Sequence, residues 1–304
     1  MIDVVVYISS VANAKKHSRK TDCLESFAAG VKQYGDTVLV QTEYMYKPAR
    51  LAVMLGWATT NTGGPNIVLR KQIIQEQKRL GAQTMCIDAS CFKYLDNQGS
   101  YLRYSLGGPF YDKAEYANKN SNADKWLEIS QALGITLNSP VTRDGGYILI
   151  CMQRDGGFAM KTLDPMVWLA DKIKQIRAVT TRPIVIRPHP GAYNLNEFKW
   201  VLQHPAVSVV DPLRTSLLKN LKSAYTAVYF NSSASVAAAC EGLPIFVDDE
   251  SCVGWTVANK SIANIENPTQ FDRRQWIYDL AAAHWTDDDG RSGRIYQKFK
   301  PFLL

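Results

Sequence analysis

Short apolar runs alternate with amphipathic helical patterns along most of the chain, and this alternation constrains the fold more than any other feature. In the second half, strand-like and helix-like segments follow one another at 147–153, 166–179, 183–187, 196–203, 207–210, 215–224, 227–230, 234–242 and 244–247. A strand followed by a helix and another strand forms a parallel sheet that helices cover. The sequence therefore predicts an α/β fold.

The first half has the same alternation, followed by a stretch of different composition. Strands are expected at 4–8, 37–41 and 83–88, and helices at 23–35 and 67–81, while 51–57 is an apolar run that ends at an aromatic residue. Residues 97–143 are rich in Gly, Asn, Ser and Tyr, so they should be loop-rich, with one helix at 125–134. The segment 138–146 resembles a linker, and helices are expected at 269–285 and 290–301. Two domains are predicted, 1–142 and 143–304, with a hinge near 135–146.

Composition agrees with a globular protein of two domains. The 304 residues are 46% hydrophobic and 21% charged, which is enough apolar mass for two cores. No apolar run reaches the roughly 18 residues of a membrane span, and the N-terminus lacks the pattern of a signal peptide. The six cysteines form no CxxC pair, so we expect reduced thiols, a cytoplasmic location and no zinc site.

The net charge of +7 has two interpretations. It is either a matter of solubility or the mark of an anionic partner, such as a nucleic acid or a phosphorylated small molecule. The bases gather early in the chain, in "NAKKHSRK" at 13–20. This clustering favours a patch over an even scatter.

Two loops carry the chemistry that the sequence makes visible. "VIRPHPGAYN" (185–194) and "VYFNSSASVAAACEGLPIFV" (228–247) both pass from an apolar strand into small, polar and turn-forming residues. Because ligands bind beyond the carboxyl ends of parallel strands, we expect these two loops to be neighbours that hold a diphosphate. Arg187 and His189 would donate to the phosphates, and Ser232 and Ser233 would open a helix whose free N–H groups favour an anion.

Simpler interpretations remain open for each loop. Ser232 would serve equally well as a helix N-cap, and the two prolines as turn formers. Two common nucleotide motifs are absent: "GGPNIVLRK" lacks the GK[ST] ending of a P-loop, and no GxGxxG follows the first strand. An ATPase and a dinucleotide oxidoreductase are therefore disfavoured.

The same loops resemble the nucleotide-sugar half of GT-B glycosyltransferases of the capsule-polysaccharide and phage-encoded types. The resemblance continues in "DDESCVGWTVAN" (248–259) and in "RRQWIYDLAAAHWTDDDGRSG" (273–293), where His284 stands in place of a Gln. "CIDASCF" (86–92) and "YLRYSLGG" (101–108) resemble a segment of the acceptor half. One departure is Ala237, at a position where many such enzymes carry a carboxylate that holds the donor ribose.

The resemblance implies a GT-B-like fold, with two Rossmann-like domains facing a cleft and C-terminal helices crossing back. It implies metal-independent transfer of a sugar from a nucleotide sugar, with a UDP-sugar as the expected donor and no tightly bound cofactor. The expected donor-binding residues are Gln153, Gly156, Arg187, His189, Pro190, Gly191, Asn231, Ser232, Ser233, Ser235 and Asp249.

The general base should come from the N-terminal half. Asp88 ends a strand and matches the acidic position of the family, so it is the first candidate, followed by Asp22 and His17. Each also has a plainer interpretation, as a helix cap, a turn residue or part of a solvated face.

The acceptor is expected to be a hydroxymethylated base in double-stranded phage DNA, since basic residues contact phosphates without reading sequence. The candidate DNA-binding residues are Lys15, Lys16, Arg19, Lys20, Trp57 and Tyr104. A polysaccharide acceptor and a non-catalytic nucleotide- or DNA-binding protein are the alternatives.

Overall fold

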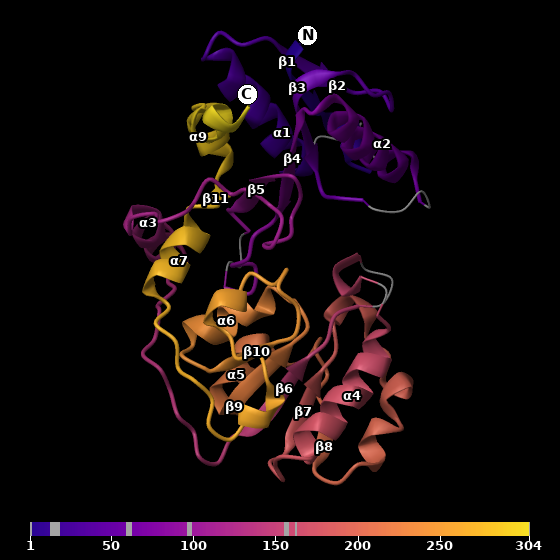
Figure 1. Cartoon of the computed structure of the whole chain (residues 1–304), viewed down its shortest axis with the longest axis vertical. Helices are drawn as coiled ribbons and strands as arrows, with labels where there is room; N and C mark the ends of the chain where they lie inside the picture. The colour runs from indigo at the N-terminus through magenta and orange to yellow at the C-terminus, as the bar shows by residue number, and fades with distance from the viewer. Residues whose placement is uncertain are drawn as a thin grey trace. The chain divides into compact units, whose positions relative to one another are not determined.

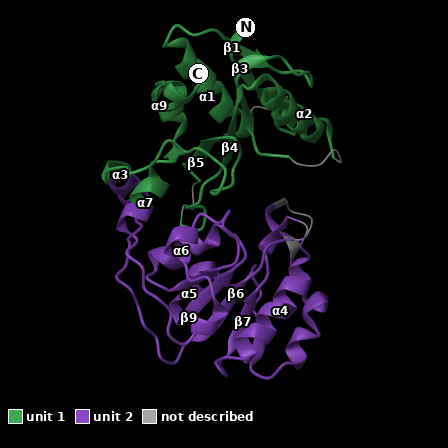
Figure 2. Ribbon diagram, in the orientation of Figure 1, with its two compact units in different colours: residues 1–125, 278–304 green, residues 126–277 purple. Residues whose placement is uncertain are grey.

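The computed structural model describes residues 2–12, 19–58, 63–95, 99–154, 158–161 and 163–303. The chain divides into two compact units: unit 1 comprises residues 1–125 and 278–304, and unit 2 comprises residues 126–277 (Figure 2). This division differs from the predicted boundary, because the last 27 residues pack with the N-terminal half of the chain.

Unit 1 is built on a six-stranded sheet in the order β11-β5-β4-β3-β1-β2. Its strands are β1 (Ile2–Tyr7), β2 (Val38–Gln41), β3 (Ala49–Leu55), β4 (Gln83–Ala89), β5 (Leu102–Leu106) and β11 (His284–Trp285). The first four are parallel, while β5 runs antiparallel to β4 and β11 antiparallel to β5. The strand β5 falls within the stretch expected to be loop-rich, because its alternating "LRYSL" is short and lies between loops.

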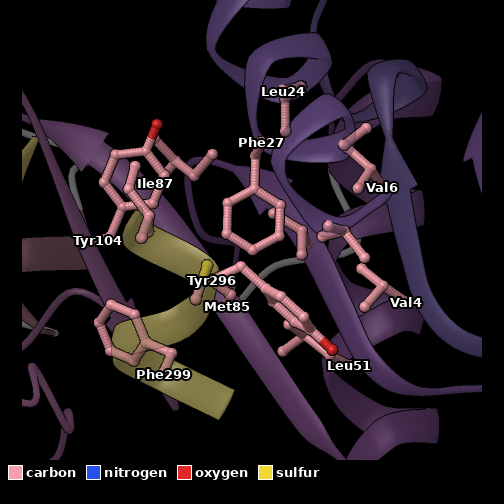
Figure 3. Close-up of a cluster of buried hydrophobic side chains, with 14 of the residues drawn as sticks. Val4, Val6, Leu24, Phe27, Leu51, Met85, Ile87, Tyr104, Tyr296 and Phe299 are labelled. Atoms are coloured by element: carbon pink, nitrogen blue, oxygen red, sulfur yellow. The ribbon is translucent and has the colours of Figure 1, made fainter. Parts of the chain in front are cut away.

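The helices of unit 1 are α1 (Arg19–Lys32), α2 (Pro65–Leu80), α8 (Asp287–Arg291) and α9 (Arg294–Phe299). Figure 3 shows Phe27 of α1, Tyr104 of β5 and Tyr296 and Phe299 of α9 in one apolar cluster with strand side chains. Gly30 allows α1 to approach α8 closely, since a Cβ there would collide with the carbonyl oxygen of Gly290. The C-terminal segment is thus part of the core of unit 1.

Unit 2 contains a five-stranded, fully parallel sheet in the order β10-β9-β6-β7-β8. Its strands are β6 (Tyr147–Cys151), β7 (Ile184–Arg187), β8 (Val207–Val209), β9 (Ala224–Tyr229) and β10 (Ile245–Val247). They coincide with the predicted strands within a few residues. Their side chains are nearly all buried except in the edge strand β8, as expected for a parallel sheet covered on both faces.

The helices of unit 2 are α4 (Pro165–Arg177), α5 (Leu217–Ser223) and α6 (Ala234–Cys240), labelled in Figure 1. The helix predicted at 196–203 is instead two 3₁₀ turns, η4 (Leu195–Phe198) and η5 (Val201–Gln203). Phe198 and Val201 are its buried residues, which gives too narrow an apolar stripe to hold a longer helix against the sheet.

Two helices, α3 (Asp124–Leu133) and α7 (Arg274–Ala281), contain the points at which the chain passes from one unit to the other. The single helix predicted at 269–285 is α7 followed by β11, and the one at 290–301 is divided between α8 and α9. Among the described residues, none of the helices has both the length and the apolar character needed to cross a membrane. All six cysteines are buried and free.

Candidate functional site

The strand order of unit 2 reverses between β6 and β9. The chain passes from β6 to β7 and β8 on one side, then returns to place β9 and β10 on the other side of β6. In open α/β sheets, ligands bind beyond the carboxyl ends of the strands at such a reversal. The expectation that the loops after β7 and β9 belong to adjacent strands is wrong, because β6 lies between them.

The side chain of Gln153, just beyond β6, connects this position to the loop after β9. Its Nε2 donates to Oδ1 of Asn231 at 2.6 Å, and its Oε1 accepts from the Asn231 backbone N–H at 3.3 Å. Two predicted donor-binding residues are therefore brought together at the reversal point. Both are only half-buried, so the pair remains accessible.

Asn231 is also bonded to the loops on either side. Its Nδ2 donates to the Ala159 carbonyl and to Oγ of Ser251, each at 2.8 Å. Ser251 in turn donates to Asp249, whose other oxygen accepts from Lys161 at 2.6 Å. Burial alone would raise the pKa of Asp249, but hydrogen bonds from Lys161 and Ser251 hold it below its usual value. Every polar atom of the Asn231 amide is thus engaged within the protein, and its role is to hold three loops in register.

Arg187 is buried at 7% exposure, and its guanidinium is hydrogen-bonded within the protein. Its Nη1 donates to the Thr215 carbonyl at 2.7 Å and to Oδ1 of Asn220 at 2.8 Å, and Nη2 lies 3.4 Å from the Pro212 carbonyl. The guanidinium therefore braces the segment that leads into α5. It is not among the residues that line the neighbouring pocket.

A pocket of about 580 Å³ opens at the carboxyl ends of β6 and β7. Of the predicted donor-binding residues, it is lined by Gln153, His189, Pro190 and Gly191. The loop after β7 forms a 3₁₀ turn, η3 (Pro190–Ala192), in which Nδ1 of His189 accepts from the Gly191 N–H at 3.0 Å. In the neutral ring the proton is then on Nε2, which makes that nitrogen a donor.

The sequence did not predict the other residues that line the pocket. They are Met152, Asp164, Pro165, Met166, Pro188, Tyr193, Asn194, Glu197 and Phe198. The dipeptide Asp164–Pro165 was a visible signal, because Asp followed by Pro marks a helix start, and Asp164 does cap α4. Glu197 and Asn194 carried no such signal in the sequence. Glu197 lies in the 3₁₀ turn η4 and Asn194 caps that turn, which stands where a longer helix had been expected.

The serines of the loop after β9 differ in burial and in hydrogen bonding. Ser232 and Ser233 are half-buried, and Oγ of Ser232 accepts from the Ala234 N–H at 3.2 Å. Ser233 caps α6 without a side-chain hydrogen bond. Ser235 is fully buried, with its Oγ 3.5 Å from Sγ of Cys252, so it packs beneath the loop and is unavailable to a ligand.

In unit 1, the candidate base Asp88 lies near the carboxyl end of β4 and pairs with Arg103 of β5. Nη2 of Arg103 donates to Oδ2 of Asp88 at 2.9 Å, and the two residues face each other in the antiparallel register. The Arg103 side chain is 9% exposed and that of Asp88 is 37% exposed. Arg103, which the sequence did not single out, therefore binds Oδ2 of the carboxylate, and the Asp88 side chain remains partly exposed.

The remaining candidates are divided. Asp22 lies in the first turn of α1, half-buried, and Lys20 is exposed. Tyr104 is fully buried and stacks on Phe27, so its predicted contact with DNA is wrong. Trp57 is half-buried and packs against Gly108. The structure does not describe Lys15, Lys16, His17 and Gly156, nor the side chain of Arg19.

Comparison with known proteins gives the fold and leaves the family open. No protein-family model and no curated protein matches the chain. Among solved structures, the chain resembles Thermosulfurimonas dismutans KpsC, β Kdo 2,4 transferase, with a TM-score of 0.58 and 13% identity over 93% of this chain and 90% of that one. It also resembles the KpsC β Kdo 2,7 transferase of the same organism, with a TM-score of 0.54 and 12% identity over 97% and 99%. The predicted α/β class with GT-B-like, Rossmann-type sheets is confirmed.

Proposed function

We propose that the chain is a glycosyltransferase that binds a nucleotide sugar in unit 2 and transfers the sugar to a hydroxyl group. The observation that carries this proposal is the pocket of about 580 Å³ beside the point where the parallel sheet reverses its order. Such a position binds ligands in open α/β sheets. The GT-B-like fold and its resemblance to proteins named β Kdo transferases also support this proposal.

The donor would lie along the loops after β6, β7 and β9. His189 and Gly191 line the pocket, while Ser232 and Ser233 follow Asn231, which is hydrogen-bonded to the pocket residue Gln153. Hydroxyl and imidazole donors would stabilise the charge that develops on the departing phosphate, which is the largest contribution in many enzymes of this kind. We expect a UDP-sugar and no metal ion.

The acceptor would be activated by Asp88. Because Arg103 occupies Oδ2 at 2.9 Å, Oδ1 is the atom that would accept the proton of an attacking hydroxyl. Asp22 is the second candidate base. Arg103 would keep the carboxylate in one orientation, as a general base requires.

Two acceptors are consistent with this chemistry. Unit 1 has 20 basic and 15 acidic residues, against 15 and 13 in unit 2, and this excess favours a polyanion such as DNA with a hydroxymethylated base. The names of the fold neighbours favour a saccharide. Binding to duplex DNA that weakens steeply with salt, and that is lost when the bases at positions 15, 16, 19 and 20 are reversed in charge, supports the first. Absence of such binding leaves the saccharide.

The donor proposal is tested by a thermal-shift panel of nucleoside mono- and diphosphates and nucleotide sugars, each with and without a chelator. We expect one nucleotide sugar to stabilise the protein without metal, and His189→Ala to remove most of that stabilisation. Lys222→Ala, on the exposed surface of α5, is the matched control and should respond as the wild type does. A panel in which no nucleotide stabilises the protein would refute the proposal and favour a non-catalytic role.

A further inference from the structure

The pocket in unit 2 has an unusual charge for a nucleotide-sugar site. The described residues that line it include two carboxylates, Asp164 and Glu197, and neither a lysine nor an arginine. Arg187, at the end of β7, is bonded to the segment before α5, and Lys161 is paired with Asp249. A phosphate or a carboxylate placed in this pocket would face the like charge of these two carboxylates.

The carboxylates also have unused hydrogen-bonding capacity. Asp164 uses Oδ1 to cap α4, accepting from the N–H groups of Met166 and Val167 at 2.7 and 3.2 Å. Glu197 uses Oε1 to accept from Nδ2 of Asn194 at 3.1 Å. For the second oxygen of each, the described part of the chain provides no donor. Both residues are exposed, so water can donate to these oxygens, and a ligand that displaces this water would have to bring donors such as hydroxyl groups, because an ionised carboxylate only accepts.

The other side of the pocket is apolar. Met152, Pro188 and Phe198 are buried side chains that line it, and Tyr193 adds a half-exposed ring. A sugar ring has C–H groups that pack against apolar surface and hydroxyls at its edge that donate to carboxylates. Such a division between apolar lining and a few placed polar groups is typical of small-molecule pockets.

We infer that this pocket takes an uncharged, hydroxyl-rich ring of the nucleotide sugar, and that Glu197 is a specificity-determining residue that accepts from the hydroxyls of that ring and disfavours a carboxylate on it. The inference rests on the proposed function and narrows its substrate class. The ring is either the ribose of the nucleotide or the transferred sugar, because both offer the same hydroxyls. The phosphates would then lie at the border of the pocket, toward His189, Ser232 and Ser233.

The test compares four probes by isothermal titration calorimetry with the full chain. UDP-glucose and UDP-glucuronate differ only in a carboxylate on the transferred sugar, and UDP and 2′-deoxy-UDP differ only in a ribose hydroxyl. If the transferred sugar occupies the pocket, UDP-glucose should bind about tenfold more tightly than UDP-glucuronate. If the ribose occupies it, UDP should bind about tenfold more tightly than its 2′-deoxy form.

Glu197→Gln should reduce whichever preference the wild type shows by about threefold or more, because it removes the charge and keeps the size. Glu128→Gln on α3 makes the same change of charge at an exposed residue outside the pocket, and should leave the preference intact. The inference is overturned by equal binding within both pairs, by a preference that Glu197→Gln does not change, or by no binding of UDP-glucose and UDP. If the nucleotide panel still shows stabilisation in any of these cases, the proposed function survives while the specificity fails.

Discussion

His284 should make the stability of unit 1 depend on pH in the acidic range. The ring is fully buried in β11. Its Nε2 lies 2.9 Å from the Cys91 backbone N–H, which can only donate, and its Nδ1 lies 2.7 Å from the Leu280 carbonyl, which can only accept. The folded protein therefore requires the neutral ring with its proton on Nδ1. Protonation of Nε2 would set two donors against each other in the core.

The size of this loss of stability follows from the pKa of His284. Burial, reinforced by the nearby charges of Arg103 and Lys125, lowers the pKa of His284 to about 3, from an unfolded value of 6.5. Because the folded pKa is depressed, the unfolded chain binds the proton first as the pH falls below 6.5. The contribution of neutral His284 to the free energy of unfolding is therefore fully present above that pH and decreases on acidification. Between about pH 7.5 and about pH 5 the loss is about 2 kcal/mol. The unfolded chain is the species that titrates in this interval, so its pKa of 6.5 sets the figure.

The assay is differential scanning calorimetry of the wild type and of His284→Gln at the two pH values. A loss of about 2 kcal/mol in a unit of this size corresponds to a fall in Tm of roughly 4–8 °C. Gln offers one donor and one acceptor and does not titrate, so the variant should lose that much less than the wild type over the same interval. Equal falls in Tm for the two proteins would refute the assignment of the neutral tautomer.

Two further changes test the packing around each sheet. Gly30→Ala should lower Tm by an amount equivalent to about 1–3 kcal/mol, because its Cβ meets the α8 backbone, whereas Gly145→Ala, with no atom within 4 Å, should be nearly neutral in calorimetry. Arg187→Met should cost about 2–4 kcal/mol in urea unfolding, because it leaves Oδ1 of Asn220 and the Thr215 carbonyl without their donor. Unchanged stability together with lost nucleotide binding would instead make Arg187 a ligand-binding residue.

The strands of unit 2 could be predicted because each is a run of apolar residues that a parallel sheet buries on both faces. The order of those strands could not, since nothing local in "YILIC" indicates that β6 lies between β7 and β9. The return of the last residues to unit 1 was expected only from the resemblance, which implied C-terminal helices crossing back. It depends on pairings such as His284 with Arg103, which are 181 positions apart in the sequence.

The location of the candidate site was predicted better than the interactions of its side chains. Gln153, His189 and Gly191 do line a pocket at the expected edge of the sheet. The sequence shows that an arginine ends a strand, but the direction of its side chain depends on which acceptors the fold supplies. For Arg187 these are main-chain carbonyls and Asn220, from a segment about 30 residues further on. Asp88 and Arg103 illustrate the converse, because their pairing requires the antiparallel register of β4 and β5.

The small residues of α6 have a structural explanation that bears on donor recognition. All seven residues from Ala234 to Cys240 are buried, and Ala237 is only 1% exposed. The α6 carbonyls are held by neighbouring segments, with Arg273 donating to the Ala239 carbonyl and the Asn138 N–H donating to that of Cys240 at 2.8 Å. A carboxylate at position 237 would be enclosed in protein and could not reach a ligand. In the proposed donor complex, the acceptors for a ligand hydroxyl would therefore come from another element, and Glu197 and Asp164 are the carboxylates that line the pocket.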